Sequence, residues 1–87
     1  MNSGDDATIS VTNLYEEVTE QDLWDLFSLY GVISTISIAK DRKTRKSRGF
    51  AFVQFVSKGD AKKAIEELDK CRHYHMILRV GWATKKQ

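Results

Sequence analysis

Apolar and polar residues alternate along four short segments of the chain, and this period of two predicts β-strands with one buried face. The four segments are residues 8–12, 35–39, 50–56 and 77–82. Two longer segments instead carry apolar residues three or four positions apart, which is the period of an amphipathic α-helix. They are residues 19–30 and 57–68. The chain is therefore expected to form its elements in the order β-α-β-β-α-β.

The ends of the two predicted helices carry residues typical of helix caps. Thr19 and Asp22 resemble a capping box, in which each side chain accepts a hydrogen bond from the backbone N–H of the other residue, and Ser57 and Asp60 repeat the pattern. Gly31 is expected to end the first helix, because glycine readily adopts the left-handed conformation common after a helix. Both helices should thus begin at a hydroxyl side chain.

This order of elements is that of a split β-α-β (ferredoxin-like) sandwich, an α+β fold. Right-handed crossovers place both helices on one face of a four-stranded antiparallel sheet and leave the other face open to solvent. The 87 residues suffice for one domain. We expect it over residues 8–84, after a disordered lead-in over residues 1–7 and before a basic tail over residues 85–87. No apolar run is long enough to span a membrane, and the polar, acidic N-terminus does not resemble a secretory signal.

Charge is distributed unevenly along the chain, although the formal net charge is only +2. Residues 1–39 contain acids but no Lys or Arg, so all 14 Lys and Arg residues follow. Residues 40–48 combine one acid, Asp41, with a dense group of bases. These bases are Lys40, Arg42, Lys43, Arg45, Lys46 and Arg48. The imbalance indicates a polyanionic partner, with a merely solvated loop as the alternative.

The segment from Arg48 to Phe55, Arg-Gly-Phe-Ala-Phe-Val-Gln-Phe, matches at every position the RNP1 signature of the RNA recognition motif (RRM). By this match and the predicted order of elements, residues 8–83 resemble that family of RNA-binding domains. Strand alternation places Phe50 and Phe52 on the open face of the sheet, where unstacked bases can lie on their rings. Arg48 is placed to reach a phosphate.

The resemblance implies a second signature on the first strand, and there the chain departs from the family pattern. Ser10 occupies the position where most RRMs carry another stacking aromatic residue, and it can hydrogen-bond a base but cannot stack on it. Gly81 offers no side chain where relatives often present a polar one. The other residues expected on the open face are polar and able to read base edges: Thr12, Ser37, Gln54 and Arg79. We therefore expect weak binding of single-stranded RNA with low sequence specificity, through this face and the basic loop.

The segment from His75 to Ala83, His-Met-Ile-Leu-Arg-Val-Gly-Trp-Ala, resembles the RRMs found in the g subunits of eukaryotic translation initiation factor 3. This resemblance implies a cytoplasmic location and a role in translation initiation and protein biosynthesis. It also implies mRNA or rRNA, other initiation-factor subunits and the small ribosomal subunit as partners. No cofactor is implied, and the isolated domain is expected to be a monomer. An RRM of pre-mRNA processing, which would be nuclear, is the alternative.

Three residues outside the open face are the basis of a second alternative, an RRM that binds protein through its helical face. Trp24 lies at the boundary of the first helix's apolar stripe. Arg72 and Tyr74 precede the last strand in a segment faintly similar to that of RRMs that bind tryptophan-bearing peptides. Those domains have Phe at the position of Tyr74, and Phe50 and Phe52 remain on the open face, so RNA is the favoured partner.

Metal binding and catalysis are not indicated by the sequence. Cys71, His73 and His75 match no standard zinc spacing. No Ser–His–Asp or paired-carboxylate arrangement lies in a recognisable catalytic context. The single cysteine cannot form an internal disulfide, which suits a reducing compartment. We expect neither an enzyme nor a metalloprotein.

Overall fold

The computed structural model describes residues 7–83 and contains the predicted order of elements, with a short two-stranded hairpin added before the last strand. Residues 1–6 and 84–87, which include most of the predicted lead-in and the whole predicted basic tail, lie outside the described residues. The helices are α1 (Glu20–Phe27) and α2 (Lys58–Leu68). The strands are β1 (Thr8–Thr12), β2 (Ile33–Lys40), β3 (Ser47–Phe55), β4 (Arg72–His73), β5 (Met76–Ile77) and β6 (Arg79–Trp82).

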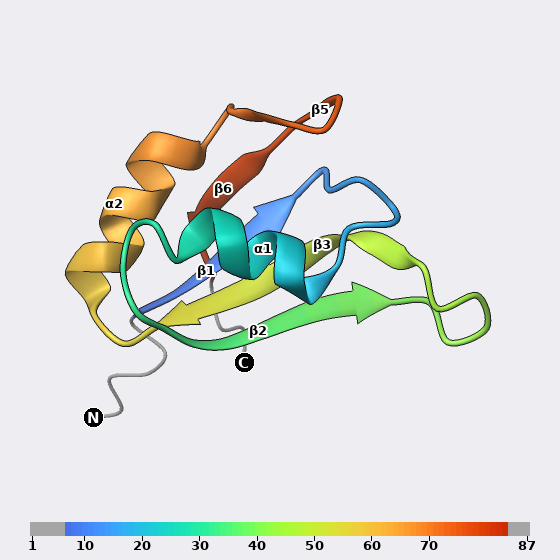
Figure 1. Cartoon of the computed structure of the whole chain (residues 1–87), viewed down its shortest axis with the longest axis horizontal. Coiled ribbons are helices and arrows are strands. Elements are labelled where there is room, and N and C mark those ends of the chain that lie inside the picture. The colour runs from blue at the N-terminus through green and yellow to red at the C-terminus, as the bar shows by residue number, and fades with distance from the viewer. Residues whose placement is uncertain (1–6, 84–87) are drawn as a thin grey trace.

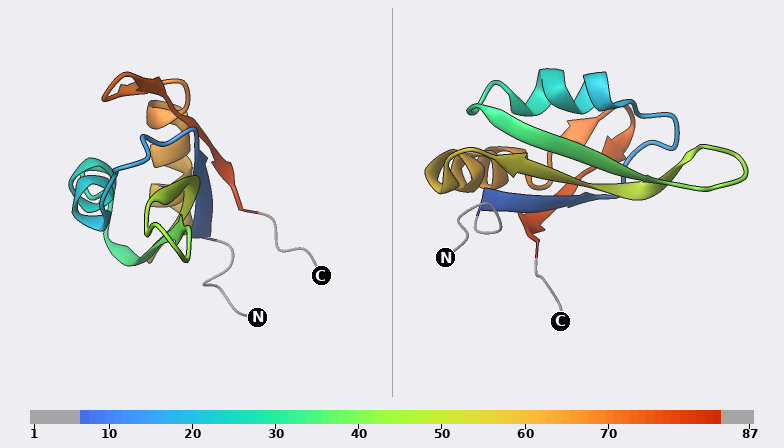
Figure 2. Two further views of the ribbon diagram at one scale, coloured as in Figure 1. Left: turned by 90° about the vertical axis from the view of Figure 1, so that its right-hand side faces the viewer. Right: turned by 90° about the horizontal axis from the view of Figure 1, so that it is seen from below.

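Four of the strands form one antiparallel sheet in the order β2-β3-β1-β6. Both helices pack against the same face of this sheet, with α1 nearer β2 and α2 nearer β1 and β6 (Figures 1 and 2). The predicted α+β split β-α-β sandwich is therefore confirmed. Its two central strands, β1 and β3, are those that carry the two predicted signatures.

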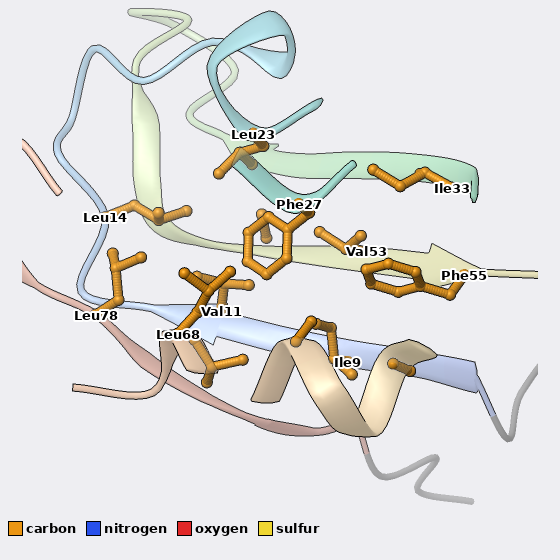
Figure 3. Close-up of a cluster of buried hydrophobic side chains, with 14 of the residues drawn as sticks. Ile9, Val11, Leu14, Leu23, Phe27, Ile33, Val53, Phe55, Leu68 and Leu78 are labelled. Atoms are coloured by element: carbon orange, nitrogen blue, oxygen red, sulfur yellow. The ribbon is translucent and has the colours of Figure 1, made fainter. Parts of the chain in front are cut away.

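The hydrophobic core fills the space between the helices and the sheet (Figure 3). Ile9 and Val11 of β1 and Val53 and Phe55 of β3 are buried there. The rings of Phe27 and Phe55 meet edge to face, with 6.4 Å between their centroids, and so connect α1 to β3. The predicted alternation of both central strands is confirmed, and it leaves their other residues on the opposite face.

The first helix is shorter than predicted. Its capping box is confirmed: Thr19 Oγ1 accepts from the Asp22 N–H at 3.1 Å, and Asp22 Oδ2 accepts from the Thr19 N–H at 3.0 Å. The helix ends at Phe27, and the N–H of Tyr30 then donates to the Phe27 carbonyl in a tight turn. Gly31 therefore does not end the helix, and its φ is not positive.

Gly31 is instead a point of close packing between the two helical segments. A Cβ atom at this position would overlap the side chain of Asp60, near the start of α2. The predicted second capping box is wrong, because the Ser57 side chain makes no capping hydrogen bond. Asp60, the residue expected to complete that box, lies against Gly31, and this contact depends on tertiary packing rather than on helix sequence.

The last predicted strand, residues 77–82, is divided in the structure. Its first part, β5, pairs with β4 in a separate two-stranded sheet, and β6 continues the main sheet. Leu78 lies between them, fully buried, and its N–H donates to the Cys71 carbonyl at 2.9 Å. The hairpin reverses at Tyr74, which has a φ of +61°. A tyrosine is an uncommon residue in that conformation, so the sequence did not indicate a turn.

The described fold begins slightly earlier than the predicted domain. Ala7, which was expected in the lead-in, is 1% exposed and belongs to the core. Neither helix within residues 7–83 is long and apolar enough to cross a membrane.

Replacing Phe55 with alanine should lower the free energy of unfolding by about 3–5 kcal/mol, because it removes a fully buried ring. Phe52→Ala on the same strand should cost about 1 kcal/mol or less, since that ring is on the open face. Urea unfolding of both variants measures the difference. A larger loss for Phe52→Ala would show that the two faces of β3 are reversed.

Candidate nucleic-acid interface

The open face of the sheet is arranged in rows that cross the strands. The central row consists of Ser37, Phe52, Ser10 and Gly81, one from each strand, because Phe52 pairs with Ser37 and Ser10, and Ser10 pairs with Gly81. Every other member of this row is small. Phe52 is consequently a single large ring flanked on both sides by residues that leave its edges accessible, and it is 40% exposed.

The neighbouring row is built around Phe50. Phe50 pairs with Thr12, and Thr12 pairs with Arg79 on the sheet edge. The Thr12 hydroxyl donates to the Arg79 carbonyl at 3.3 Å. That bond leaves the hydroxyl oxygen of Thr12 to accept from a ligand, while the exposed guanidinium of Arg79 can donate.

Phe50 and Phe52 form one aromatic unit. Their ring centroids are 6.0 Å apart and the rings are nearly perpendicular, at 83°. Arg48 extends the unit, since its guanidinium carbon lies 6.0 Å from the centroid of Phe50. Phe50 is partly buried and Phe52 is exposed, so Phe52 is the more accessible of the two rings. Gln54 lies in the next row, paired with Thr8 and Thr35.

The predicted basic loop joins β2 to β3 and projects beyond the end of the sheet (Figure 1). Four of its six bases line a single open hollow of about 490 Å³, together with Asp41. These four are Lys40, Arg42, Lys43 and Arg48. Lys46 is instead directed to Glu16, with 3.6 Å between Nζ and the carboxylate, and Arg45 occupies a left-handed position with a φ of +68°. The structure therefore brings together four of the six predicted cations.

Asp41 organises this loop. Its Oδ1 accepts from the N–H of Lys43 at 2.8 Å and from the N–H of Thr44 at 3.0 Å. Its backbone carbonyl accepts from the Arg45 N–H at 2.8 Å. The backbone bonds from Thr44 and Lys43, helped by the charge of Arg48, lower the pKa of the Asp41 carboxyl. In the sequence Asp41 stands out only as an opposing charge, although aspartate before a short polar loop is a known turn signal.

Gly49 connects the loop to the part of β3 that carries Phe50 and Phe52. It has a φ of +94°, a conformation that residues with a side chain rarely adopt. The pairing of β2 with β3 shifts register around it, since Ile38 pairs with Ala51 while Lys40 pairs with Ser47. This bulge lets the strand leave the loop and still present Phe50 on the open face.

The three residues considered for protein binding lie away from the open face. Trp24 is on α1 and is 43% exposed, and Arg72 is an exposed residue of β4. Tyr74, at the tip of the β4–β5 hairpin, packs against Tyr15, with 5.0 Å between ring centroids. The negative charge of Asp22 beside it raises the pKa of Tyr74.

Metal ligation is not supported by the placement of side chains. In the part of the chain that the structure describes, no three His, Cys, Asp or Glu residues are grouped so that they could hold a metal ion.

Comparison with known proteins identifies the family of this protein. The profile of the RNA recognition motif family matches residues 9–75. Among solved structures, a complex of the Sex-lethal protein with RNA is 33% identical, with a TM-score of 0.89 over 93% of this chain and 48% of that chain. The crystal structure of RNA Binding Protein PG1 is 37% identical, with a TM-score of 0.87 over 93% of this chain and 98% of that one. The chain belongs to the RNA recognition motif family.

Within that family, the chain is similar to the G subunit of eukaryotic translation initiation factor 3. It is 48% identical to the Caenorhabditis elegans protein over 81 residues, which are 93% of this chain and 31% of that protein. It is 52% identical to the Nematostella vectensis protein over 77 residues, which are 88% of this chain and 26% of that protein. The chain therefore spans about a third or less of the length of these relatives.

Protonation of Asp41 should loosen the basic loop only at low pH. Because the folded loop lowers the pKa of this carboxyl, its stabilising effect is complete above about pH 4 and is lost as the pH falls through the lowered value. The amide resonances of Lys43 and Thr44 should therefore stay constant between about pH 7 and pH 5. Asp41→Ala should speed hydrogen exchange at both amides at neutral pH, whereas Glu67→Ala on α2 should not. Equal exchange in the two variants would contradict the proposed role of Asp41.

Proposed function

We propose that this RRM binds single-stranded RNA across the open face of its sheet. The observation that carries the proposal is the exposed Phe52 ring, held next to Phe50 and between small residues. An exposed aromatic ring on a rigid strand offers a π surface to an unstacked base, and such stacking stabilises a complex by about 1–3 kcal/mol per base. The similarity to the Sex-lethal protein, solved in complex with RNA, supports the same use of this fold.

The basic hollow supplies the attraction for the RNA backbone. Four cations surround it, and Asp41 neutralises only part of their charge. Arg48 borders the hollow and also lies beside Phe50, so one strand of RNA can contact the phosphate-binding and base-stacking parts together. Phosphate contacts of this kind position a nucleic acid but do not read its sequence.

The affinity is expected to be modest and the sequence specificity low. Ser10 provides no second stacking ring beside Phe52, so stacking is confined to β3. The remaining contacts come from polar side chains and from the charged loop, whose contribution depends on salt. We expect a binding module without catalytic activity, monomeric as an isolated domain.

We further propose that the chain is the RNA-binding part of a subunit of translation initiation factor 3 and acts in the cytoplasm. Identities of 44–52% to G-subunit proteins of animals and fungi support this assignment. The partners would then be mRNA or rRNA, other initiation-factor subunits and the small ribosomal subunit. Affinity purification of the longer protein should recover initiation-factor subunits. Recovery of splicing proteins instead would favour the nuclear alternative.

Removal of the exposed ring tests the binding face directly. Phe52→Ala should weaken binding of a short single-stranded RNA by about 1–3 kcal/mol. Trp24→Ala is the matched control, because it removes an aromatic ring of similar exposure from the helical face. Fluorescence anisotropy titrations of the folded variants give both values. Weaker RNA binding by Trp24→Ala together with unchanged binding by Phe52→Ala would show that the helical face is the functional one.

Salt dependence tests the basic hollow. If its cations neutralise about three phosphates, log Kobs should fall with log salt concentration with a slope near −2. The double variant Arg42→Ala/Lys43→Ala should flatten that slope by about one unit and weaken all RNA sequences alike. Lys62→Ala/Lys63→Ala on α2 changes the net charge equally but should leave the slope nearly unchanged. A slope near zero for the unmodified domain would remove the electrostatic role.

A further inference from the structure

A second hollow of about 250 Å³ lies at β1 and β6, toward the edge of the sheet that is farther from β2. Its lining residues are Ser10, Thr12, Asp69, Arg79, Val80 and Gly81. The hollow exists because Ser10 is small and Gly81 has no side chain: a Cβ atom at Gly81 would meet no atom within 4 Å. Its volume is below the roughly 300–1,000 Å³ of pockets that enclose small molecules. It suits a single planar base resting on the sheet.

Asp69 holds a carboxylate at the rim of this hollow. The residue caps the C-terminal end of α2, and its Oδ1 accepts from the N–H of Val80 at 3.0 Å. The next residue, Lys70, donates its N–H to the carbonyl of Leu78, just before β6, at 2.8 Å. The helix end and the strand edge together fix the position of the carboxylate. An ionised carboxylate has about four lone-pair sites, so the bond from Val80 leaves acceptor capacity for a ligand.

The two charged groups of the hollow have opposite roles in hydrogen bonding. The Asp69 carboxylate only accepts, and the guanidinium of Arg79 only donates. A base that lies over Ser10 and Gly81 therefore binds best with its N–H groups directed toward Asp69. Guanine presents two adjacent donors, N1–H and the 2-amino group, and can bind a carboxylate with both. Uracil has one N–H flanked by two carbonyl oxygens, which the carboxylate repels.

We propose that Asp69 is a specificity-determining residue that selects guanine in this hollow, beside the base stacked on Phe52. The proposal rests on the RNA binding proposed above and adds one selective position to a face that otherwise binds RNA with low specificity. The negative charge of Asp69 also offsets that of Arg79 and so weakens the attraction of this hollow for phosphate. A bidentate, charge-assisted pair of this kind is among the stronger contacts available to a base.

The test uses short single-stranded RNAs that differ at one position. A five-nucleotide oligouridine is compared with the same oligonucleotide carrying guanosine, or inosine, at the central position. The domain should bind the guanosine oligonucleotide about tenfold tighter than oligouridine. Inosine, which lacks the 2-amino group, should fall between them.

Asp69→Asn is the decisive variant, because an asparagine oxygen can still accept from the Val80 N–H while the carboxylate is lost. Its preference for guanosine over uridine should fall to about twofold or less. Glu67→Gln on the exposed side of α2 removes the same charge and should keep the preference. Thermal unfolding verifies that both variants fold.

The outcomes separate this proposal from the binding that it presupposes. RNA binding that depends on Phe52 but shows no preference for guanosine, or an unchanged preference in Asp69→Asn, would overturn the role of Asp69 alone. RNA binding that is absent, or that does not respond to Phe52→Ala, would overturn both proposals.

Discussion

Burial of one face of the two central strands is the constraint on which the rest of this structure depends. Ile9 and Val11 of β1 and Val53 and Phe55 of β3 face the helices. Because side chains alternate along a strand, their burial forces the residues between them onto the open face. A shift of either strand by one residue would bury the residues of the open face and expose those of the core, so the core also maintains the register of the open face. Stability and the proposed RNA binding thus use opposite faces of the same two strands.

The basic loop shows how a charged segment can be ordered without being buried. Asp41 accepts two backbone N–H bonds and carries a charge opposite to that of its neighbours, so it reduces their mutual repulsion while shaping the turn. The ion pair between Lys46 and Glu16 is solvent-exposed and contributes little stability by itself. Four of the loop's other five cations line one hollow. Their orientation concentrates positive charge at the end of the sheet where Arg48 meets Phe50.

The open face is asymmetric. Its β3 side is aromatic and suits stacking, whereas its β1 and β6 side has small and hydrogen-bonding residues. The absence of an aromatic residue at position 10 looks in the sequence like the loss of half a platform. In the structure, Ser10 and Gly81 open a hollow that reaches Asp69. The small residue at position 10 therefore weakens stacking but creates room for hydrogen bonds to a base. Hydrogen bonds discriminate between bases better than stacking does.

The sequence by itself determined the features that depend on near neighbours along the chain. The strand alternation, the Thr19 cap and the placement of Phe50 and Phe52 all follow from short-range periodicity, because the period of two and the helical period act within each element. Tertiary structure alone decided the features that need residues far apart. Packing against Asp60 explains Gly31, and the turn of the basic loop is shaped by the hydrogen bonds to Asp41. Asp69 and Ser10 line one hollow only because the end of α2 lies beside β6. Such contacts leave no local pattern, since either partner alone is an ordinary surface residue.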